Sequence, residues 1–292
     1  MSIEMNTLIQ IVKTALAEDV GPGDITSLAC LEPYPFKGQI VAKSDGIVSG
    51  LEAFARTFEI VDSANNLKFL LRDGDSFKSG DIIIDIDGFN QTVLTAERTA
   101  LNFLGRLSGI ATLTGLFVKE INNSSVQIID TRKTTPGWRM LEKKAVVHGG
   151  GQNHRFGLYD MILIKDNHIA SAGSIKSAIN NCRIFLNSPE FRIQFNKPLE
   201  DIIIEVEVEN ETQLKEAIDS GADRLLLDNQ SIESLKKLVT IAKDLNSAVK
   251  LEASGNVSLE NVKAISETGV DFISIGAITH SAPCADFSLK AK

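Results

Sequence analysis

Two cations stand side by side in the segment DTRKTTPG, directly after the short apolar run at residues 126–129. They are Arg132 and Lys133. Arginine offers a planar fork that matches a carboxylate or a phosphate, and lysine adds a compact positive charge. The pair favours binding of a small anion, although a basic surface loop has the same composition.

The region 130–168 is basic within an acidic chain. It holds seven Lys/Arg against four Asp/Glu and three of the four histidines, whereas the net charge is -8. A nucleic-acid-binding protein needs a broad positive face, so we expect no nucleic-acid partner. A local cationic island suits a small anion. Glycines 149–151, before His154 and Arg155, would let backbone N–H groups approach it closely.

Lys165 ends the apolar run MILIK. A lysine that enters a core is rare unless it is paired or functional, so a functional role is favoured. An ion pair with Asp166 or another carboxylate is the alternative. The histidine spacing does not predict a transition-metal site, and His154 and His168 are candidates for hydrogen bonds to ligand oxygen atoms.

Carboxylates at positions 205, 207 and 209 alternate with valines, so they would share one face of a strand. Three isoleucines begin the same run and favour a strand buried on both faces. The alternative is an edge strand with a solvated acidic face. Asp228 similarly ends the run LLLD. At least one of these carboxylates then needs a partner, and a divalent cation or ribose hydroxyls would serve. Together the carboxylates are candidate ligands for Mg²⁺, which prefers oxygen.

Apolar runs separated by helix-like stretches predict parallel strands, and the lengths favour βα units and a barrel. The runs are 126–129, 161–164, 202–208, 225–227, 249–251 and 272–275. Polar residues follow or end each run. Because carboxyl ends of barrel strands meet at one mouth, these residues are expected to form one site.

The first hundred residues predict a mixture of helices and antiparallel strands. A helix capped by Asn6 is expected first, then strands at 38–49 and 81–87 with Ile82, Ile84 and Ile86 on one face. Thr95 is the expected cap of a helix at 96–107.

The 292 residues, 43% of them hydrophobic, suffice for one large or two ordinary globular domains. The three cysteines are far apart and predict neither disulfides nor a zinc site. No membrane span or signal peptide is expected, which makes the cytoplasm the predicted compartment.

Eight segments resemble the quinolinate phosphoribosyltransferase family in order and spacing, along nearly the whole chain. They are EDVGPGDITS (18–27), ERTALNFLGRLSGIAT (97–112), DTRKTTPGWR (130–139), GGGQNHRFGLYDMILIKDNHI (149–169), IEVEVEN (204–210), LLLDN (225–229), LEASGNV (251–257) and ISIGAITHS (273–281).

The resemblance implies an α/β fold with two domains. An N-terminal open-faced α/β sandwich would occupy residues 1–112, completed by about 279–292, and an incomplete α/β barrel of the seven-stranded type would occupy 113–278. It also implies a homodimer, or a hexamer made of three dimers. In the dimer the N-terminal domain of one subunit would cover the barrel mouth of the other, and Arg98 would act across the interface.

The implied reaction transfers a phosphoribosyl group from phosphoribosyl pyrophosphate to quinolinate, with release of pyrophosphate and CO₂, and yields nicotinate mononucleotide for NAD biosynthesis. Mg²⁺ is the implied cofactor. Lys133, Lys165, Glu207 and Asp228 would be catalytic, and the two acids would bind the metal. The implied substrate-binding residues are Arg98, Thr131, Arg132, Lys133, His154, Arg155, Lys165, Glu207, Asp228, Ser254, Gly255, Asn256, Ile275, Gly276 and Ala277.

Departures from the family pattern are Trp138, Lys144 and a long stretch at 183–201. We expect the first two to lie near the site and to alter affinity, and the third to change a surface loop. Two other functions are compatible with the motifs. A relative with the same phosphoribosyl site would accept another acid, such as nicotinate, but the arginines favour a dicarboxylate. The second is a noncatalytic sensor of a phosphate ligand. Such a sensor would not need all of the four residues Lys133, Lys165, Glu207 and Asp228, and all four are present.

Overall fold

The computed structural model describes residues 3–122, 125–195 and 197–292. The described chain forms two compact units. The first comprises Met1–Gly115, Lys133–Gly151 and Ala277–Lys292, and the second comprises Leu116–Arg132 and Gln152–Gly276. The segment 133–151 thus makes its contacts in the first unit, whereas the domain limits expected from the sequence stay predictions.

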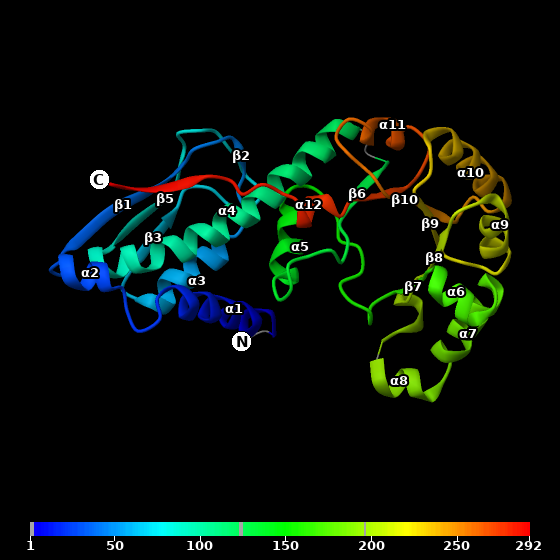
Figure 1. Cartoon of the computed structure of the whole chain (residues 1–292), viewed down its shortest axis with the longest axis horizontal. Coiled ribbons are helices and arrows are strands. Elements are labelled where there is room, and N and C mark those ends of the chain that lie inside the picture. Colours follow the sequence, from blue (N-terminus) through cyan, green and yellow to red (C-terminus); the bar gives the residue numbers. More distant parts are fainter. Residues whose placement is uncertain (1–2, 123–124, 196) are drawn as a thin grey trace. The chain divides into compact units, whose positions relative to one another are not determined.

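The first unit is built on a four-stranded antiparallel sheet of order β12-β1-β5-β3. Its strands are β1 (Pro35–Ala42), β3 (Asn66–Phe69), β5 (Ile82–Phe89) and β12 (Phe287–Ala291), and β2 (Gly46–Ile47) pairs separately with β4 (Ser76–Phe77). In Figure 1, β12 in red runs beside β1 in blue, so the end of the chain supplies an edge strand to the N-terminal sheet.

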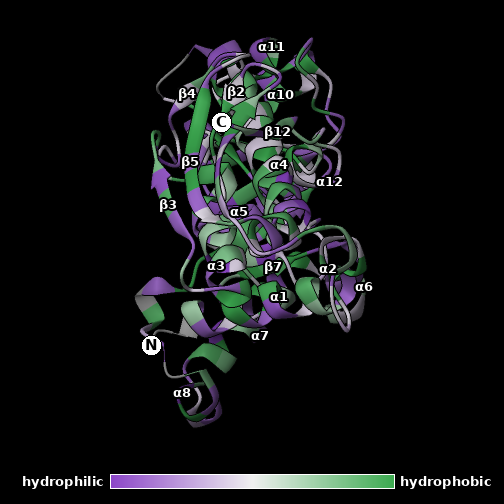
Figure 2. Ribbon diagram, turned by 90° about the vertical axis from the view of Figure 1, so that its left-hand side faces the viewer, coloured by the Kyte–Doolittle hydropathy of each residue, from purple (hydrophilic) through white to green (hydrophobic). Residues whose placement is uncertain are grey.

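Helices α3 (Leu51–Val61) and α4 (Asn90–Ile121, which ends in the second unit) share one hydrophobic core with the sheet of the first unit. The other helices of this unit are α1 (Ile3–Asp19), α2 (Ile25–Cys30), α5 (Arg139–His148) and α12 (Ala277–His280). Phe54 and Phe58 of α3 pack with Ile40, Ile84 and Leu104 from β1, β5 and α4. Figure 2 shows β5 largely green and the edge strand β3 largely purple, in keeping with their burial.

Both helix starts expected near the N-terminus were wrong. The first helix begins at Ile3, so Asn6 lies inside it. The second begins at Asn90, and Thr95 lies inside with its hydroxyl donating to the Gln91 carbonyl at 2.8 Å. A threonine hydroxyl can bond to the preceding turn, which makes a helix interior and a cap look alike in sequence.

The strand prediction at 81–87 was correct in type, but its register was not simple alternation. A bulge shifts the pairing between Ile40 and Val41, so Ile82 is 37% exposed while Ile83 is fully buried. Residues 43–45 also interrupt the expected strand at 38–49, which divides into β1 and β2.

By length and composition α4 could cross a membrane, but 61% of its most apolar 18-residue window is buried inside the structure. Its core-facing residues include Phe103, Leu104 and Leu107. The burial favours a core helix.

The second unit contains the predicted parallel sheet, of order β6-β11-β10-β9-β8-β7. Its strands are β6 (Gln127–Ile129), β7 (Ile162–Ile164), β8 (Ile204–Val208), β9 (Arg224–Asp228), β10 (Lys250–Ser254) and β11 (Phe272–Ser274). Among the described residues β6 and β7 are the sheet edges, and Gln152 forms a single parallel bridge to Ile129. This confirms the predicted α/β fold with an incomplete barrel.

Helices connect these strands. They are α6 (Asp166–Ala172), α7 (Ile175–Leu186), α8 (Pro189–Phe195), the 3₁₀ helix η1 (Leu199–Asp201), α9 (Glu211–Asp219), α10 (Ile232–Leu245) and α11 (Val262–Ser266). The long stretch at 183–201 is therefore largely helical instead of an extended surface loop. Its aromatic residues pack on one another, since Phe191 stacks on Phe195 at 5.2 Å and meets Phe185 edge-on at 5.8 Å.

Candidate active site

The parallel sheet of the second unit brings polar residues from separate segments to one edge. Asp228 and Ser254 end β9 and β10 and are register partners, and Ser254 is also paired with Ser274 at the end of β11. All six strands run in the same direction, so their carboxyl ends share this edge.

The turns after β9 and β10 are tied together. The backbone amide of Asn229 donates to the Ser254 carbonyl at 2.9 Å, and the Asn256 amide group donates to the Asn229 side-chain oxygen at 3.2 Å. Gly255 has a φ of +94°, and a Cβ there would overlap the Asn229 side chain. Only glycine suits this turn.

Lys165 forms an ion pair with Glu207 on the neighbouring strand. Its side chain is 45% exposed, so the expectation of a lysine entering the core was wrong. The lysine has a carboxylate partner, and its functional role stays a prediction. Glu205 is fully buried, which excludes the alternative of a solvated acidic edge strand, whereas Glu209 lies beyond the end of β8 and is exposed.

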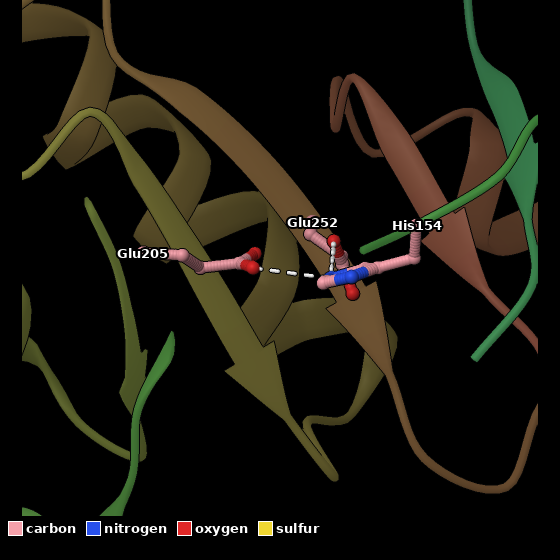
Figure 3. Close-up of side chains that lie close together, drawn as sticks. All are labelled: His154, Glu205 and Glu252. Carbon is pink, nitrogen blue, oxygen red and sulfur yellow. Dashed lines mark hydrogen bonds and ion pairs between the residues drawn. The ribbon is translucent and has the colours of Figure 1, made fainter. Parts of the chain in front are cut away.

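Figure 3 shows three side chains that meet inside the second unit: His154 from a loop, Glu205 from β8 and Glu252 from β10. Nε2 of His154 lies 3.1 Å from Glu205 Oε2 and 3.4 Å from Glu252 Oε2. Both glutamates are fully buried and the histidine side chain is 7% exposed. A buried carboxylate pair of this kind requires positive charge or a proton nearby.

The pKa values of His154 and Glu205 in this cluster are both raised. Burial alone would lower the pKa of His154, but the two carboxylates outweigh it and raise the pKa to about 9. Burial and the charge of Glu252 raise the pKa of Glu205 to about 7. Burial would raise the pKa of Glu252 as well, but the contact with His154 outweighs it and holds that pKa below the usual value.

The same three residues have ligand atoms within 4.8 Å of one another, as a metal site would. Yet the Arg155 backbone amide lies 2.7 Å from Nδ1 of His154, which leaves the proton of the neutral ring on Nε2, the nitrogen that faces the glutamates. Arg224 adds positive charge 3.5 Å from Glu252. The negative charge of the two glutamates is thus balanced by protons within the cluster and by the Arg224 guanidinium.

Two of the predicted anion-binding arginines, Arg132 and Arg155, belong to the second unit. Burial and the nearby charge of Arg132 both lower the pKa of Arg155. The loop that carries His154 and Arg155 is held by Asp130, which is fully buried and accepts the His154 backbone amide at 2.8 Å. Two like charges held in this way favour an anion between them.

Three other predicted site residues, Arg98, Lys133 and Ala277, lie in the first unit. Lys133 is exposed, and its carbonyl accepts the Thr279 hydroxyl at 2.8 Å. Arg98 is exposed on α4 and lines a cavity of about 590 Å³. The other lining residues are Leu101, Asn102, Gly105, Arg106, Thr135, Trp138, Cys284, Ala285, Asp286 and Phe287. Trp138, a departure from the family pattern, stacks on Phe103 at 4.6 Å.

His168, His148 and Lys144 each have a polar partner. His168 accepts the Lys165 backbone amide at 3.0 Å, and His148 contacts the Ser49 hydroxyl at 2.8 Å. Lys144 forms an ion pair with Glu4 at 3.1 Å.

Sequence reasoning missed Glu252 and Arg224. Glu252 stands in the run LEAS on a buried strand, where an acid between apolar neighbours signals a buried partner. Arg224 begins β9 and lies over the Phe272 ring at 4.1 Å. The contact between Arg224 and Glu252 could not be predicted from their spacing in the sequence, because the two residues meet only through the pairing of β9 with β10.

Comparisons with known proteins agree with this architecture. The family model described as quinolinate phosphoribosyl transferase, N-terminal domain, matches residues 24–108, and the model of the C-terminal domain matches residues 110–290. A probable nicotinate-nucleotide pyrophosphorylase [carboxylating] of Bacillus subtilis is 42% identical over 93% of this chain and 89% of the relative. A chloroplastic nicotinate-nucleotide pyrophosphorylase [carboxylating] of Arabidopsis thaliana is 40% identical over 96% of this chain and 81% of the relative. The structure of the nicotinate-nucleotide pyrophosphorylase from Francisella tularensis is 37% identical, with a TM-score of 0.90 over 98% of this chain and 96% of that one.

Proposed function

We propose that this chain, which belongs to the quinolinate phosphoribosyl transferase family, transfers the phosphoribosyl group of phosphoribosyl pyrophosphate to quinolinate with loss of CO₂. The products are nicotinate mononucleotide and pyrophosphate, for NAD biosynthesis. The observation that carries the proposal is the arrangement at the carboxyl edge of the parallel sheet. There the Lys165–Glu207 ion pair and the register partners Asp228 and Ser254 offer the cation and the oxygen atoms that two anionic substrates and Mg²⁺ require.

Quinolinate is held by cations in this proposal. Arg132, Arg155 and Lys165 belong to the second unit and Lys133 follows Arg132 in the chain. Arginine binds a carboxylate through two parallel N–H bonds, and lysine adds charge without fixing geometry. His154 acts on substrate binding by positioning Arg155 and not by direct contact, because its ring nitrogens already contact Glu205 and the Arg155 amide.

Phosphoribosyl pyrophosphate lies at the strand ends in this proposal. The turn of Ser254, Gly255 and Asn256 and the segment of Ile275, Gly276 and Ala277 face the phosphates, and Thr131 lies beside the cations. Glu207 and Asp228 hold Mg²⁺, since both offer the hard oxygen atoms that this ion prefers. Mg²⁺ held by these residues would supply positive charge to the pyrophosphate group.

The chain contributes positioning and electrostatics. Two anions repel each other in solution, and a cationic site brings the pyridine nitrogen to the anomeric carbon. The nitrogen forms the new bond as pyrophosphate leaves. The positive charge of the resulting pyridinium stabilises the electron pair that stays on the ring carbon when the adjacent carboxylate departs as CO₂, and that carbon then takes up a proton from solvent. Lys133, Lys165, Glu207 and Asp228 act at the charges that change in these steps.

We also propose a homodimer, as the first assembly step or within a hexamer, in which Arg98 serves the partner's site. The exposed position of Arg98 beside a cavity supports this proposal. The three cysteines are free thiols, which supports a reducing compartment such as the cytoplasm.

The test incubates the purified protein with quinolinate, phosphoribosyl pyrophosphate and Mg²⁺, and measures nicotinate mononucleotide and CO₂. Nicotinate serves as a parallel substrate. We expect product from quinolinate alone. Product from nicotinate instead would assign the chain to another acid, and no product from either would reject the proposed transfer.

A further inference from the structure

We infer that Arg106, Glu142 and Thr279 form a buried brace that sets the position of the backbone from Lys133 to Thr135, and that they are positioning residues for the transfer. The inference rests on the proposed function of Lys133. All these residues lie in the first unit, so the brace is complete within one compact body.

Glu142 is the centre of the brace. It lies on α5 and is fully buried, and both of its oxygen atoms accept hydrogen bonds. Oε1 accepts from Arg106 Nη2 at 2.9 Å and from the Thr135 hydroxyl at 2.8 Å, and Oε2 accepts the Thr135 backbone amide at 3.0 Å. The carboxylate thereby joins α4 to the loop that follows Lys133.

Arg106 extends the brace to the end of the chain. Its guanidinium donates to the carbonyl of Thr279 and, at 3.0 Å, to the carbonyl of Ala282. Thr279 is itself fully buried, and its hydroxyl donates to the Lys133 carbonyl at 2.8 Å. A planar guanidinium holds several acceptors in fixed directions, which suits this role better than a lysine would.

Two proposed substrate segments are thus tied to one ion pair. Lys133 is bound through Thr279, and α12, which carries Thr279, begins at Ala277, a proposed phosphate-binding residue. A buried ion pair is weak evidence for stability alone, because the cost of removing charges from water is large. We therefore infer that the Arg106–Glu142 pair serves to fix the position of the backbone at Lys133.

The variant Thr279→Val removes the hydroxyl bond to Lys133 with little change in volume. We expect kcat to fall about tenfold while KM for both substrates stays within about twofold, because misplacement affects the transition state most. Thr279→Ser keeps the hydroxyl and should retain kcat. Thr57→Val is the matched control, since Thr57 is equally buried in the same unit and donates to the Ala53 carbonyl at 2.9 Å, away from the loop.

Hydrogen exchange gives a second measurement that does not require activity. Exchange of the Thr135 amide should accelerate in Glu142→Gln and Thr279→Val but not in Thr57→Val. The inference is wrong if Thr279→Val keeps kcat, or if Thr57→Val loses as much. If the wild type transfers nothing to quinolinate, the proposed function fails, and unchanged exchange in both brace variants would then reject the brace as well.

Discussion

The ammonium group of Lys165 is paired with the carboxylate of Glu207, so a proposed anion ligand and a proposed Mg²⁺ ligand neutralise each other. The two residues come from the ends of adjacent parallel strands. Binding of Mg²⁺ by Glu207 would open this pair and make the lysine available to an anion. Metal and substrate binding should therefore be coupled.

Glu207→Gln removes the charge that would serve Mg²⁺. We expect the Mg²⁺ concentration for half-maximal activity to rise at least tenfold, on the order of 1.4 kcal/mol or more. Initial rates across a Mg²⁺ titration measure the change. Glu211→Gln is the control, because Glu211 forms an exposed pair with Lys215 at 2.8 Å. An unchanged Mg²⁺ dependence in Glu207→Gln would remove Glu207 from the metal site.

Arg155→Lys keeps the positive charge but loses the planar guanidinium, which can donate two parallel hydrogen bonds to a carboxylate. We expect KM for quinolinate to rise roughly 10- to 100-fold, because hydrogen bonds to charged groups contribute about 1.5–3 kcal/mol. KM for phosphoribosyl pyrophosphate should change less. Steady-state kinetics test this, with Arg192→Lys on the exposed face of α8 as control. Equal increases in both KM values would contradict a dedicated carboxylate ligand.

Gly255→Ala should both destabilise the second unit and raise KM for phosphoribosyl pyrophosphate. The residue has a φ of +94° and an added Cβ meets Asn229. Gly173→Ala separates the two effects, since Gly173 has a φ of +90° with open space around it. In urea unfolding, the free energy of unfolding should fall by about 1 kcal/mol more in Gly255→Ala than in Gly173→Ala. Equal losses would show that backbone strain alone matters.

The buried His154 cluster should make folding stability depend on pH. Folding raises the pKa of His154 from 6.5 to about 9, so its contribution is complete below pH 6.5 and is lost as the pH rises through about 9. The raised pKa of Glu205, about 7, acts in the same direction at lower pH. The free energy of unfolding should thus fall between pH 7 and 9, by on the order of 3 kcal/mol at most.

Urea unfolding at several pH values measures this slope. His154→Gln should flatten it, whereas His280→Gln, at an exposed position, should leave it unchanged. A slope that persists in His154→Gln would place the titrating group elsewhere.

Much of the architecture was determined by the sequence itself. The runs near residues 126, 161, 202, 225, 249 and 272 became the six parallel strands, because apolar segments of this length separated by helices can bury both faces only in such a sheet. Polar residues at the ends of those runs, such as Asp228, were consequently found at one edge of the sheet. The eight motifs likewise indicated the family that the matches to both domain models show.

Tertiary structure alone decided which side chains are partners. Glu252 meets His154 and Arg224 because strand pairing and a returning loop bring positions far apart in the sequence together. Lys165 was expected in a core, but its strand ends one residue earlier and the side chain reaches Glu207 instead. Glu142 likewise reads as an ordinary helical acid, yet it is fully buried between Arg106 and Thr135. Burial and long-range pairing depend on how elements pack, and local patterns carry no record of that packing.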